Sequence, residues 1–434
     1  MLVRTCDALL KALRGGEYDP ALAALYALDG SQASLDRARD RAGRTVRSLM
    51  DSFSPVGEAA LFSGPGRTEI GGNHTDHQHG HVLCGSVDMD MLACAAPNGK
   101  NVIRILSEGY PALEVGLDDL SVRPSDANTS AALVRGVAAK IRELGDYPLA
   151  GFDAYVTSTV LSGSGLSSSA AYEVLVGNIL NRFCCGDRLD PVTIAKIGQY
   201  AENVHFGKPC GLMDQMGSSV GGAVAIDFAD PADPVVERAD YDFSRSGHTL
   251  CIVDTCSSHG DLTGDYADIT LEMGGVAAHF GKTVLREVPE ADFRSAIPAL
   301  RKECGDRAVL RALHFYDDDR RAVEEAQALE EGDFHRFLGL VNSSGISSAL
   351  HLQNTWSIAD PEQQAIPVVL AVGRELLEGT GAIRVHGGGF AGTVQAFVPN
   401  EKLDAFKSGM EALLGQGKCH VLHIRPAGGC VVAE

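Results

Sequence analysis

A glycine- and serine-rich segment at residues 163–170 stands between a strand pattern and a helix pattern. Alternating residues at 152–158 predict the strand, and Ala171, Val174 and Leu175 lie on one face of the predicted helix. Glycine allows close backbone approach, and a helix N-terminus attracts anions through its N–H groups and its dipole. The segment is therefore a candidate polyphosphate-binding loop, although a serine N-cap on an ordinary helix gives the same pattern. Its candidate binding residues are Gly163, Ser164, Gly165, Leu166, Ser167, Ser168 and Ser169.

Two other glycine-rich places fit nucleotide-binding motifs less well. Residues 281–283 look like the end of a P-loop, but Val276 stands where the first glycine is required. Residues 387–392 spell the G-x-G-x-x-G of dinucleotide-binding loops, which need a helix directly after them. A strand pattern follows instead at residues 393–398, so we expect a tight glycine turn between two strands.

Residues 66–80 place many polar groups in a glycine-rich frame, which is typical of functional loops. Arg67 is a candidate for binding phosphate or orienting a carboxylate, and Asp76 for accepting hydrogen bonds from hydroxyl groups. A metal site in this stretch is disfavoured, because the histidine spacing matches no zinc motif. The histidines are His74, His77, His79 and His81.

Glu202 and Asp214 form a second acidic pair, with Asp214 directly after a Pro-Cys-Gly turn. Mg²⁺ prefers carboxylate and hydroxyl oxygens, and a hydroxyl that attacks a γ-phosphate needs a carboxylate to take or orient its proton. Two separated acids can divide those roles. Single acidic residues on turns are more often solvated surface groups, so the pair gains meaning only from its neighbours.

Composition limits the class of protein. The 434 residues suffice for two or three domains, and a net charge of -20 makes nucleic acid an unfavourable partner. The 11 cysteines form no C-x-x-C pair, so we expect free thiols in a reducing compartment. The N-terminus lacks a signal-peptide pattern, and the apolar runs are too short to span a membrane. The sequence thus predicts a cytoplasmic protein without membrane contact.

Helix and strand patterns alternate along the chain without a regular βαβ period. Residues 1–55 read as helices that cap the main body, and residues 264–340 are mostly helical. Strand patterns at 382–398 and 419–432 flank a helix pattern at 403–414. This order favours an α+β fold over a doubly wound α/β fold.

Taken together, these stretches resemble galactokinases of the GHMP kinase family over roughly residues 60–434. Residues 66–80 are similar to the G-R-x-N-x-I-G-E-H-T-D-Y signature, and residues 163–170 to the G-x-G-L-S-S-S-A phosphate loop. Residues 210–215 resemble C-G-I-M-D-Q, and residues 386–392 resemble the G-G-G-F-G-G loop. The four motifs also follow one another in the family's order.

The resemblance implies a two-domain α+β fold with the active site between the domains. The predicted parts are a helical extension at 1–55, a first domain at 56–240 and a second domain at 241–434. It also implies Mg²⁺-dependent transfer of the γ-phosphate of ATP to the anomeric hydroxyl of a hexose, by a monomer or homodimer.

Each predicted site residue takes its role from the matching family position. Asp214 would be the catalytic carboxylate, steadied by Arg67, and Ser169 and Glu202 would hold Mg²⁺. Residues 163–169 would bind ATP. The expected sugar-binding residues are Asn73, His74, Thr75, Asp76 and Tyr266.

Departures from the family motif leave the sugar open. Asn73 stands where the family has a glutamate that accepts a hydrogen bond from the C6 hydroxyl, and Glu69 replaces the family's asparagine. Tyr266 lacks the usual Asn-Arg pair after it. Because neutral Asn73 would not repel a C6 carboxylate, a galacturonate 1-kinase is an alternative to a galactose 1-kinase. A non-catalytic sugar sensor is a further alternative, which the intact serine loop disfavours.

Overall fold

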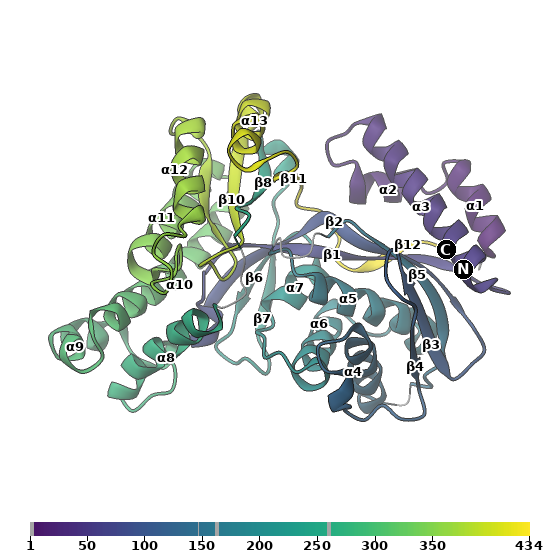
Figure 1. The fold of residues 1–434 in the computed structure, drawn as a ribbon, viewed down its shortest axis with the longest axis horizontal. Coiled ribbons are helices and arrows are strands. Elements are labelled where there is room, and N and C mark those ends of the chain that lie inside the picture. Colours follow the sequence, from purple (N-terminus) through teal and green to yellow (C-terminus); the bar gives the residue numbers. More distant parts are fainter. Residues whose placement is uncertain (1–3, 146, 161–164, 258–261) are drawn as a thin grey trace.

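The computed structural model describes residues 4–145, 147–160, 165–257 and 262–434. Two sheets form its framework, one of eight strands and one of four. Figure 1 shows the larger sheet across the centre and right of the molecule, and the smaller one standing to its left. Both sheets are largely antiparallel with helices packed around them, so the α+β prediction is confirmed.

The larger sheet is built around two long strands, β1 (Ala60–Gly71) and β2 (His81–Pro97). Its order is β12-β1-β2-β5-β3-β4, and β6 and β7 extend it from the first half of β2. Among these strands only β3 and β5 pair in parallel. The remaining bounds are β3 (Val102–Ser107), β4 (Leu113–Gly116), β5 (Phe152–Ser158), β6 (Ala223–Asp227), β7 (Val235–Ala239) and β12 (Cys430–Ala433).

Sequence patterns did not predict β1 and β2, because these strands are covered on both faces. Every residue of β1 is buried, so the usual alternation of polar and apolar residues is missing. Gly64 shows how tightly β1 is covered, because a Cβ there would lie 2.2 Å from the carbonyl oxygen of Ala171. The glycine lets the helix after the phosphate loop pack directly on the strand.

Helices α4 (Ser130–Glu143), α5 (Ser168–Leu180), α6 (Pro191–Tyr200) and α7 (Met213–Val220) lie below the larger sheet in Figure 1. The strand predicted next to this layer at 152–158 is confirmed as β5. The layer places the first turns of α5 and α7 near each other at one end of β1, where the predicted phosphate and carboxylate motifs lie.

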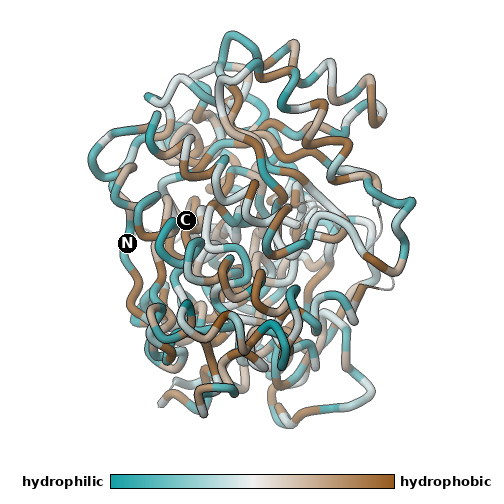
Figure 2. The backbone as a smooth tube through the Cα atoms, turned by 90° about the vertical axis from the view of Figure 1, so that its left-hand side faces the viewer, coloured by the Kyte–Doolittle hydropathy of each residue, from teal (hydrophilic) through white to brown (hydrophobic). Residues whose placement is uncertain are grey.

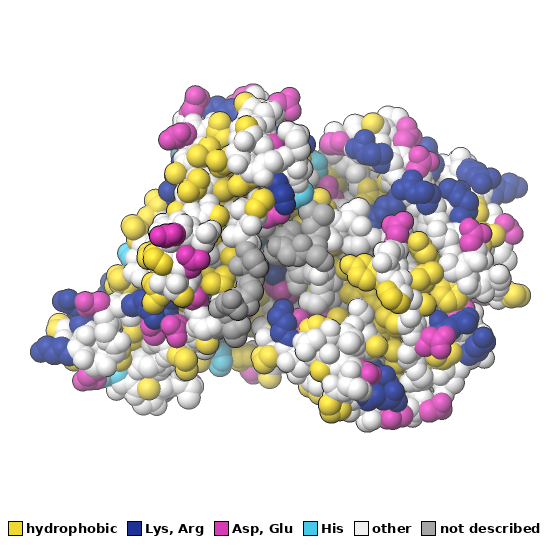
Figure 3. All heavy atoms as spheres, in the orientation of Figure 1, with side chains coloured by type: hydrophobic (Ala, Val, Ile, Leu, Met, Phe, Trp, Pro, Cys, Tyr) yellow, Lys and Arg dark blue, Asp and Glu magenta, His cyan; other side chains and the backbone are white. Residues whose placement is uncertain are grey.

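The N-terminal helices α1 (Cys6–Arg14), α2 (Asp19–Tyr26) and α3 (Gln32–Phe53) form the predicted helical cap. Their apolar faces pack against Leu61 of β1 and Leu92 and Cys94 of β2. In Figure 3, Lys and Arg side chains gather over these helices at the upper right. Although the whole chain is strongly acidic, this end presents a mixed and locally basic surface.

The smaller sheet has the order β11-β8-β10-β9. Its strands are β8 (His248–Asp254), β9 (Ala382–His386), β10 (Thr393–Pro399) and β11 (Cys419–Leu422). Helices α11 (Phe334–Ser347), α12 (Ala365–Leu377) and α13 (Leu403–Leu414) pack on this sheet. Helices α8 (Thr263–His279) and α9 (Glu290–Glu303) pack instead on α10 (Asp306–Glu330), which contacts the larger sheet. The expected turn at residues 387–392 joins β9 and β10 as an antiparallel pair.

Hydrophobic and hydrophilic stretches alternate along the helices in Figure 2, as expected for helices that cover a sheet with one face. After β11 the chain returns to the larger sheet, where β12 pairs with β1 from Leu61 to Ser63. Within the described ranges, no helix combines the length and apolarity needed to cross a membrane.

Candidate active site

Arg67 and Asp214 meet at the centre of the site. The Arg67 Nε donates to Asp214 Oδ1 at 2.7 Å, and its Nη2 lies 2.5 Å from the same oxygen. Arg67 also bonds the phosphate loop, since its Nη1 donates to the carbonyl of Gly165 and its backbone N–H to that of Leu166. Arg67, in the motif at residues 66–80, thus contacts both the motif at residues 163–170 and the motif at residues 210–215.

Ser167 connects the start of α5 to the same carboxylate. It adopts a left-handed conformation with φ 55° and makes no capping hydrogen bond, so the plain N-cap interpretation is wrong. Instead its Oγ donates to Asp214 Oδ2 at 2.6 Å. The first turn of α5 therefore keeps backbone N–H groups without a side-chain cap, directly beside Asp214. The predicted binding residues Gly163 and Ser164 lie outside the described residues.

The charge on Asp214 is held by its neighbours. Burial opposes ionisation, but the Arg67 guanidinium and hydrogen bonds from Ser167 and Arg67 keep the pKa of Asp214 below its usual value. The side chain remains 28% exposed, so a substrate hydroxyl can approach it. Asp214 is thus an ionised, partly accessible carboxylate at neutral pH.

Ser169 and Glu202 lie together, as the metal-site prediction requires. The Ser169 Oγ donates to Glu202 Oε1 at 3.0 Å, and Glu202 is 1% exposed in the π-helical segment Ala201–Phe206. Gln215, next to Asp214, donates its Nε2 to Glu202 Oε2 at 2.9 Å and to Glu173 Oε2 at 3.0 Å. The predicted metal ligands therefore belong to one network with Gln215, the neighbour of the predicted catalytic carboxylate Asp214.

Two oxygens in this network have no hydrogen-bond partner in the described part of the chain, Glu173 Oε1 and Gln215 Oε1. Burial, together with the nearby Glu202, raises the pKa of Glu173 well above its usual value. The donor set fits a hydrated Mg²⁺, because that ion binds few protein oxygens and keeps waters that need acceptors around them. Sequence reasoning missed Glu173, although its place four residues after Ser169 puts both on one face of α5.

The glycine turn between β9 and β10 lies against the phosphate loop. A Cβ on Gly165 would lie 2.9 Å from Thr393 Oγ1 and 3.0 Å from His386 Nδ1. Several side chains from other segments bond the carbonyl groups of this turn. Asn73 bonds the Gly387 carbonyl at 2.8 Å, and Tyr266 bonds the Gly389 carbonyl at 2.9 Å. The Gly388 carbonyl is bonded by His74 at 2.9 Å and by Asn354 at 3.1 Å.

The residues predicted to bind sugar lie around this turn and the Asp214 motif. A Cβ on Gly211 would lie 2.6 Å from Asp76 Oδ2, so the Asp76 carboxylate packs on the backbone three residues before Asp214. Burial and the nearby His77 lower the pKa of His74 to about 4, which leaves a neutral ring. Thr75 is fully buried and its hydroxyl bonds the carbonyl groups of Gly72 and His81.

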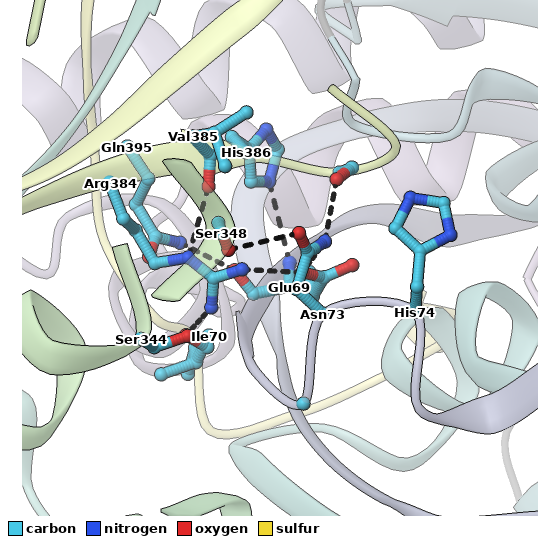
Figure 4. A network of polar contacts seen from close by, with 12 residues as sticks. Glu69, Ile70, Asn73, His74, Ser344, Ser348, Arg384, Val385, His386 and Gln395 are labelled. Carbon is cyan, nitrogen blue, oxygen red and sulfur yellow. Dashed lines mark hydrogen bonds and ion pairs between the residues drawn. The ribbon is translucent and has the colours of Figure 1, made fainter. Parts of the chain in front are cut away.

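Asn73 differs from its neighbours because it is 0% exposed. Its Nδ2 donates to Glu69 Oε1 and to the carbonyl of Gly387, both at 2.8 Å. Glu69 in turn pairs with Arg384 at 2.8 Å. Figure 4 shows these side chains converging from β1, the loop after it and β9. A direct sugar contact by Asn73 therefore remains a prediction, and its observed contacts are all within the protein.

The four sequence motifs thus meet in one place, although they are far apart along the chain. Figure 3 shows a recess between the part of the surface that carries α8–α13 and the part that carries α1–α7. Chemically, the site offers an ionised carboxylate, a guanidinium, an uncapped helix start and a hydroxyl–carboxylate pair. These are the groups that phosphoryl transfer to a hydroxyl requires.

Comparison with known proteins identifies the family. Residues 132–222 match the model for the GHMP kinases N terminal domain, and residues 51–97 match the galactokinase galactose-binding signature. The chain is 32% identical over 354 residues to the galactokinase of Streptomyces coelicolor, covering 81% of this chain and 87% of that protein. The chain belongs to the galactokinase family of GHMP kinases. A galactokinase of Streptomyces lividans is 31% identical over 350 residues, covering 80% and 83% of the two chains.

Solved structures agree with this galactokinase fold. The crystal structure of Lactococcus lactis galactokinase complexed with galactose superposes with a TM-score of 0.75 at 21% identity, covering 90% of this chain and 99% of that one. Methanococcus jannaschii mevalonate kinase gives a TM-score of 0.60 at 14% identity, covering 85% and 99%. The recognition of the GHMP kinase fold from sequence is therefore confirmed.

Proposed function

We propose that this galactokinase family member transfers the γ-phosphate of ATP to the anomeric hydroxyl of galactose. The observation that carries the proposal is the contact of Ser167, at the start of α5, with the Asp214 carboxylate that Arg67 also holds. This contact puts the anion-binding end of a helix next to the group that receives a hydroxyl. Curated relatives named galactokinase support the choice of sugar.

The start of α5 is proposed to bind the polyphosphate of ATP. Its N–H groups and dipole favour an anion, and Arg67 adds positive charge on the side of Asp214. Ser169 and Glu202 would hold Mg²⁺, which when bound neutralises charge on the phosphate oxygens. All eleven cysteines carry free thiols, which supports the predicted cytoplasmic location.

Asp214 is proposed to accept a hydrogen bond from the anomeric hydroxyl and orient its oxygen toward the γ-phosphate. Its depressed pKa makes it a weak base, so orientation and charge stabilisation suit it better than early proton removal. In a loose transition state the hydroxyl becomes acidic only as the bond to phosphorus forms. Asp214 then takes the proton at that stage.

His74, Asp76 and Tyr266 are proposed to line the sugar end of the site. The Asp76 carboxylate packs on the backbone of Gly211, three residues before Asp214. A sugar hydroxyl bound by Asp76 would therefore lie close to the Asp214 carboxylate. The neutral His74 ring and the Tyr266 hydroxyl offer hydrogen bonds without adding charge. Neutral and acidic partners suit an uncharged sugar.

The test is ADP release with purified protein and a panel of hexoses, with galactose and galacturonate side by side because they differ only at C6. We expect turnover with galactose. In Asp214→Asn we expect kcat to fall about a thousandfold while ATP still binds, and Asp233→Asn is the matched control because its side chain is 86% exposed.

Faster ADP release with galacturonate than with galactose would show that the protein is a uronic acid 1-kinase instead. ATP binding without turnover on any hexose would indicate a sugar sensor instead. Full activity in Asp214→Asn would remove Asp214 from the mechanism.

A further inference from the structure

The glycine turn at residues 387–389 is held by side chains from other segments in addition to a backbone hydrogen bond from Ala391 to Gly389. Gly387 and Gly389 have φ angles of 68° and 82°. Glycine adopts this left-handed conformation without strain, but it also has access to many other conformations. The carbonyl groups of the turn accept hydrogen bonds from Asn73, Asn354 and Tyr266, and that of Gly388 also bonds His74. The position of the turn therefore depends on these partners.

All the hydrogen-bonding groups of the Asn73 side chain are already used within the protein. Its Nδ2 uses both hydrogens, one toward Glu69 and one toward Gly387. Its Oδ1 accepts from Asn354 Nδ2 at 2.8 Å and from Ser348 Oγ at 3.3 Å. An asparagine amide offers two donors and one oxygen with two lone pairs, so no hydrogen-bonding capacity is left for a ligand.

The backbone of Asn73 is fixed as well. Its N–H donates to Asp318 Oδ2 at 2.8 Å, and its carbonyl bonds His314 Nε2 at 2.9 Å, both from α10. The amide therefore cannot turn toward the cleft without breaking a buried network. Each broken buried bond leaves a polar group without a partner.

Arg384 anchors the other side of the network. It is 0% exposed, and its Nη2 pairs with Glu69 while its Nη1 donates to the carbonyl of Ile70 at 2.5 Å. Arg384 lies in β9, three residues before the turn, and Glu69 lies in β1, two residues after Arg67. The contacts thus connect β1, through Glu69 and Asn73, to the glycine turn (Figure 4).

We propose that Asn73 is a positioning residue for the sugar end of the site: it holds the turn at residues 387–389 in place and does not contact the sugar. The kinetic part of this inference rests on the proposed function. Without Asn73 the Gly387 carbonyl loses its side-chain donor, and His74 and Tyr266 rest on a turn that is no longer fixed. Small displacements of positioning groups have large effects on productive binding.

The first experiment compares Asn73→Ala with Asn342→Ala, both checked for folding by circular dichroism. Asn342 is a matched control because it also bonds the backbone around β9, but at the other end, through Gly381 and Ile383. In Asn73→Ala we expect KM for galactose to rise about tenfold while KM for ATP changes little. In Asn342→Ala we expect neither KM to change.

A conservative variant separates the two hydrogen-bonding ends of the side chain. Asn73→Asp keeps an acceptor for Asn354 and Ser348 but turns a second oxygen toward Glu69 and the Gly387 carbonyl. We therefore expect no rescue relative to Asn73→Ala. Normal sugar affinity in Asn73→Asp would overturn the proposal.

The second experiment needs no catalysis, so it decides the inference even if no sugar is turned over. Hydrogen–deuterium exchange of peptides covering residues 387–392 is measured without ligand in the wild type and both alanine variants. We expect faster exchange in Asn73→Ala only. Raised KM for galactose with unchanged exchange would indicate direct contact, and equal effects in both variants would indicate general destabilisation; either result overturns the proposal.

Discussion

Two buried carboxylates, Asp90 and Glu69, each pair with arginine but behave in opposite ways. Asp90 accepts from Arg41 Nη1 at 2.6 Å, from the Tyr26 hydroxyl at 2.7 Å and from Ser63. Its environment thus combines residues of the N-terminal helices with β1. Glu69 has fewer donors, one from Arg384 and one from Asn73, both at 2.8 Å.

The difference in donors decides the ionisation of the two groups. Burial raises the pKa of both, but in Asp90 the charges of Arg41 and Arg425 and the hydroxyl bonds outweigh it and lower the pKa. In Glu69, Arg384 and the more distant Arg67 do not suffice, and burial raises the pKa to about 7. A buried carboxylate stays charged only when several donors replace its lost water.

The two networks also serve different parts of the molecule. Asp90 uses its backbone to bond Thr159, which directly follows β5 and leads toward the phosphate loop. The N-terminal helices therefore complete the sheet that carries the proposed ATP-binding segment. Glu69 instead joins Arg384 of β9 to Asn73, which bonds the glycine turn.

The largest expected effect is in Arg41→Ala. Removing Arg41 leaves Asp90 buried with one arginine, and losing one partner of a buried pair costs about 3–5 kcal/mol of unfolding free energy. Urea denaturation measures this loss. Arg37→Ala on the same helix is the control, because Arg37 is exposed and, within the described part of the chain, its hydrogen bond is to Ser34 rather than to a carboxylate. Equal small losses in both variants would contradict a structural role for the Asp90 network.

A second prediction concerns pH and Glu69. Between the unfolded value near 4.5 and the folded value of about 7, the native protein binds more protons than the unfolded chain. The contribution of Glu69 to stability is therefore full below about pH 4.5 and is lost as pH rises through 7. Unfolding free energy should fall across this window by up to about 3 kcal/mol.

Glu69→Gln should remove that pH dependence, because glutamine keeps the acceptor oxygen for Arg384 and Asn73 but does not titrate. Chemical denaturation at several pH values between 4.5 and 7.5 measures the slope. The groups facing Glu69 are Arg384, Arg67, Asp76, Asn73 and Glu325. Asp90→Asn should leave the slope in this window unchanged, since the Asp90 contribution is lost only as pH falls below about 4. An unchanged slope in Glu69→Gln would assign the titration elsewhere.

The smallest expected effect is in Tyr26→Phe. It removes one hydroxyl donor from Asp90 while both arginines remain, so we expect a loss of about 1–2 kcal/mol. Thermal or urea denaturation measures the loss, and Tyr110→Phe is a control because that ring is 68% exposed. A loss as large as that of Arg41→Ala would show that hydroxyl donors matter as much as charge.

The catalytic part of the site was predictable from sequence, and its supporting network was not. Arg67, Ser169, Glu202 and Asp214 stand in motifs whose chemistry requires those residue types, and the structure brings them together. Asn73 stands in such a motif too, but its partners Asn354 and Gly387 lie far along the chain, so no local pattern reveals its burial.

In the fold, too, some elements were predictable from the sequence and others were not. Helices at the N-terminus and around α10 were predicted because one face of each is solvated and the apolar period is visible. β1 and β2 were not predicted, since both faces are covered and the alternation disappears. Asp90 follows Asp88 by two residues on the same strand, and nothing in its neighbours along the chain indicates that Arg41 reaches it.

The return of the chain from β11 to β12 has a consequence for synthesis on the ribosome. β1 pairs with β12 from Leu61 to Ser63, but residues 72–429 emerge between the two strands. During that time one edge of β1 has no neighbour, and the apolar side chains that β12 covers stay open to solvent. Nascent chains of this protein therefore carry an unfinished sheet edge until residues 430–433 have been synthesised, and holding by a chaperone would matter most before that point.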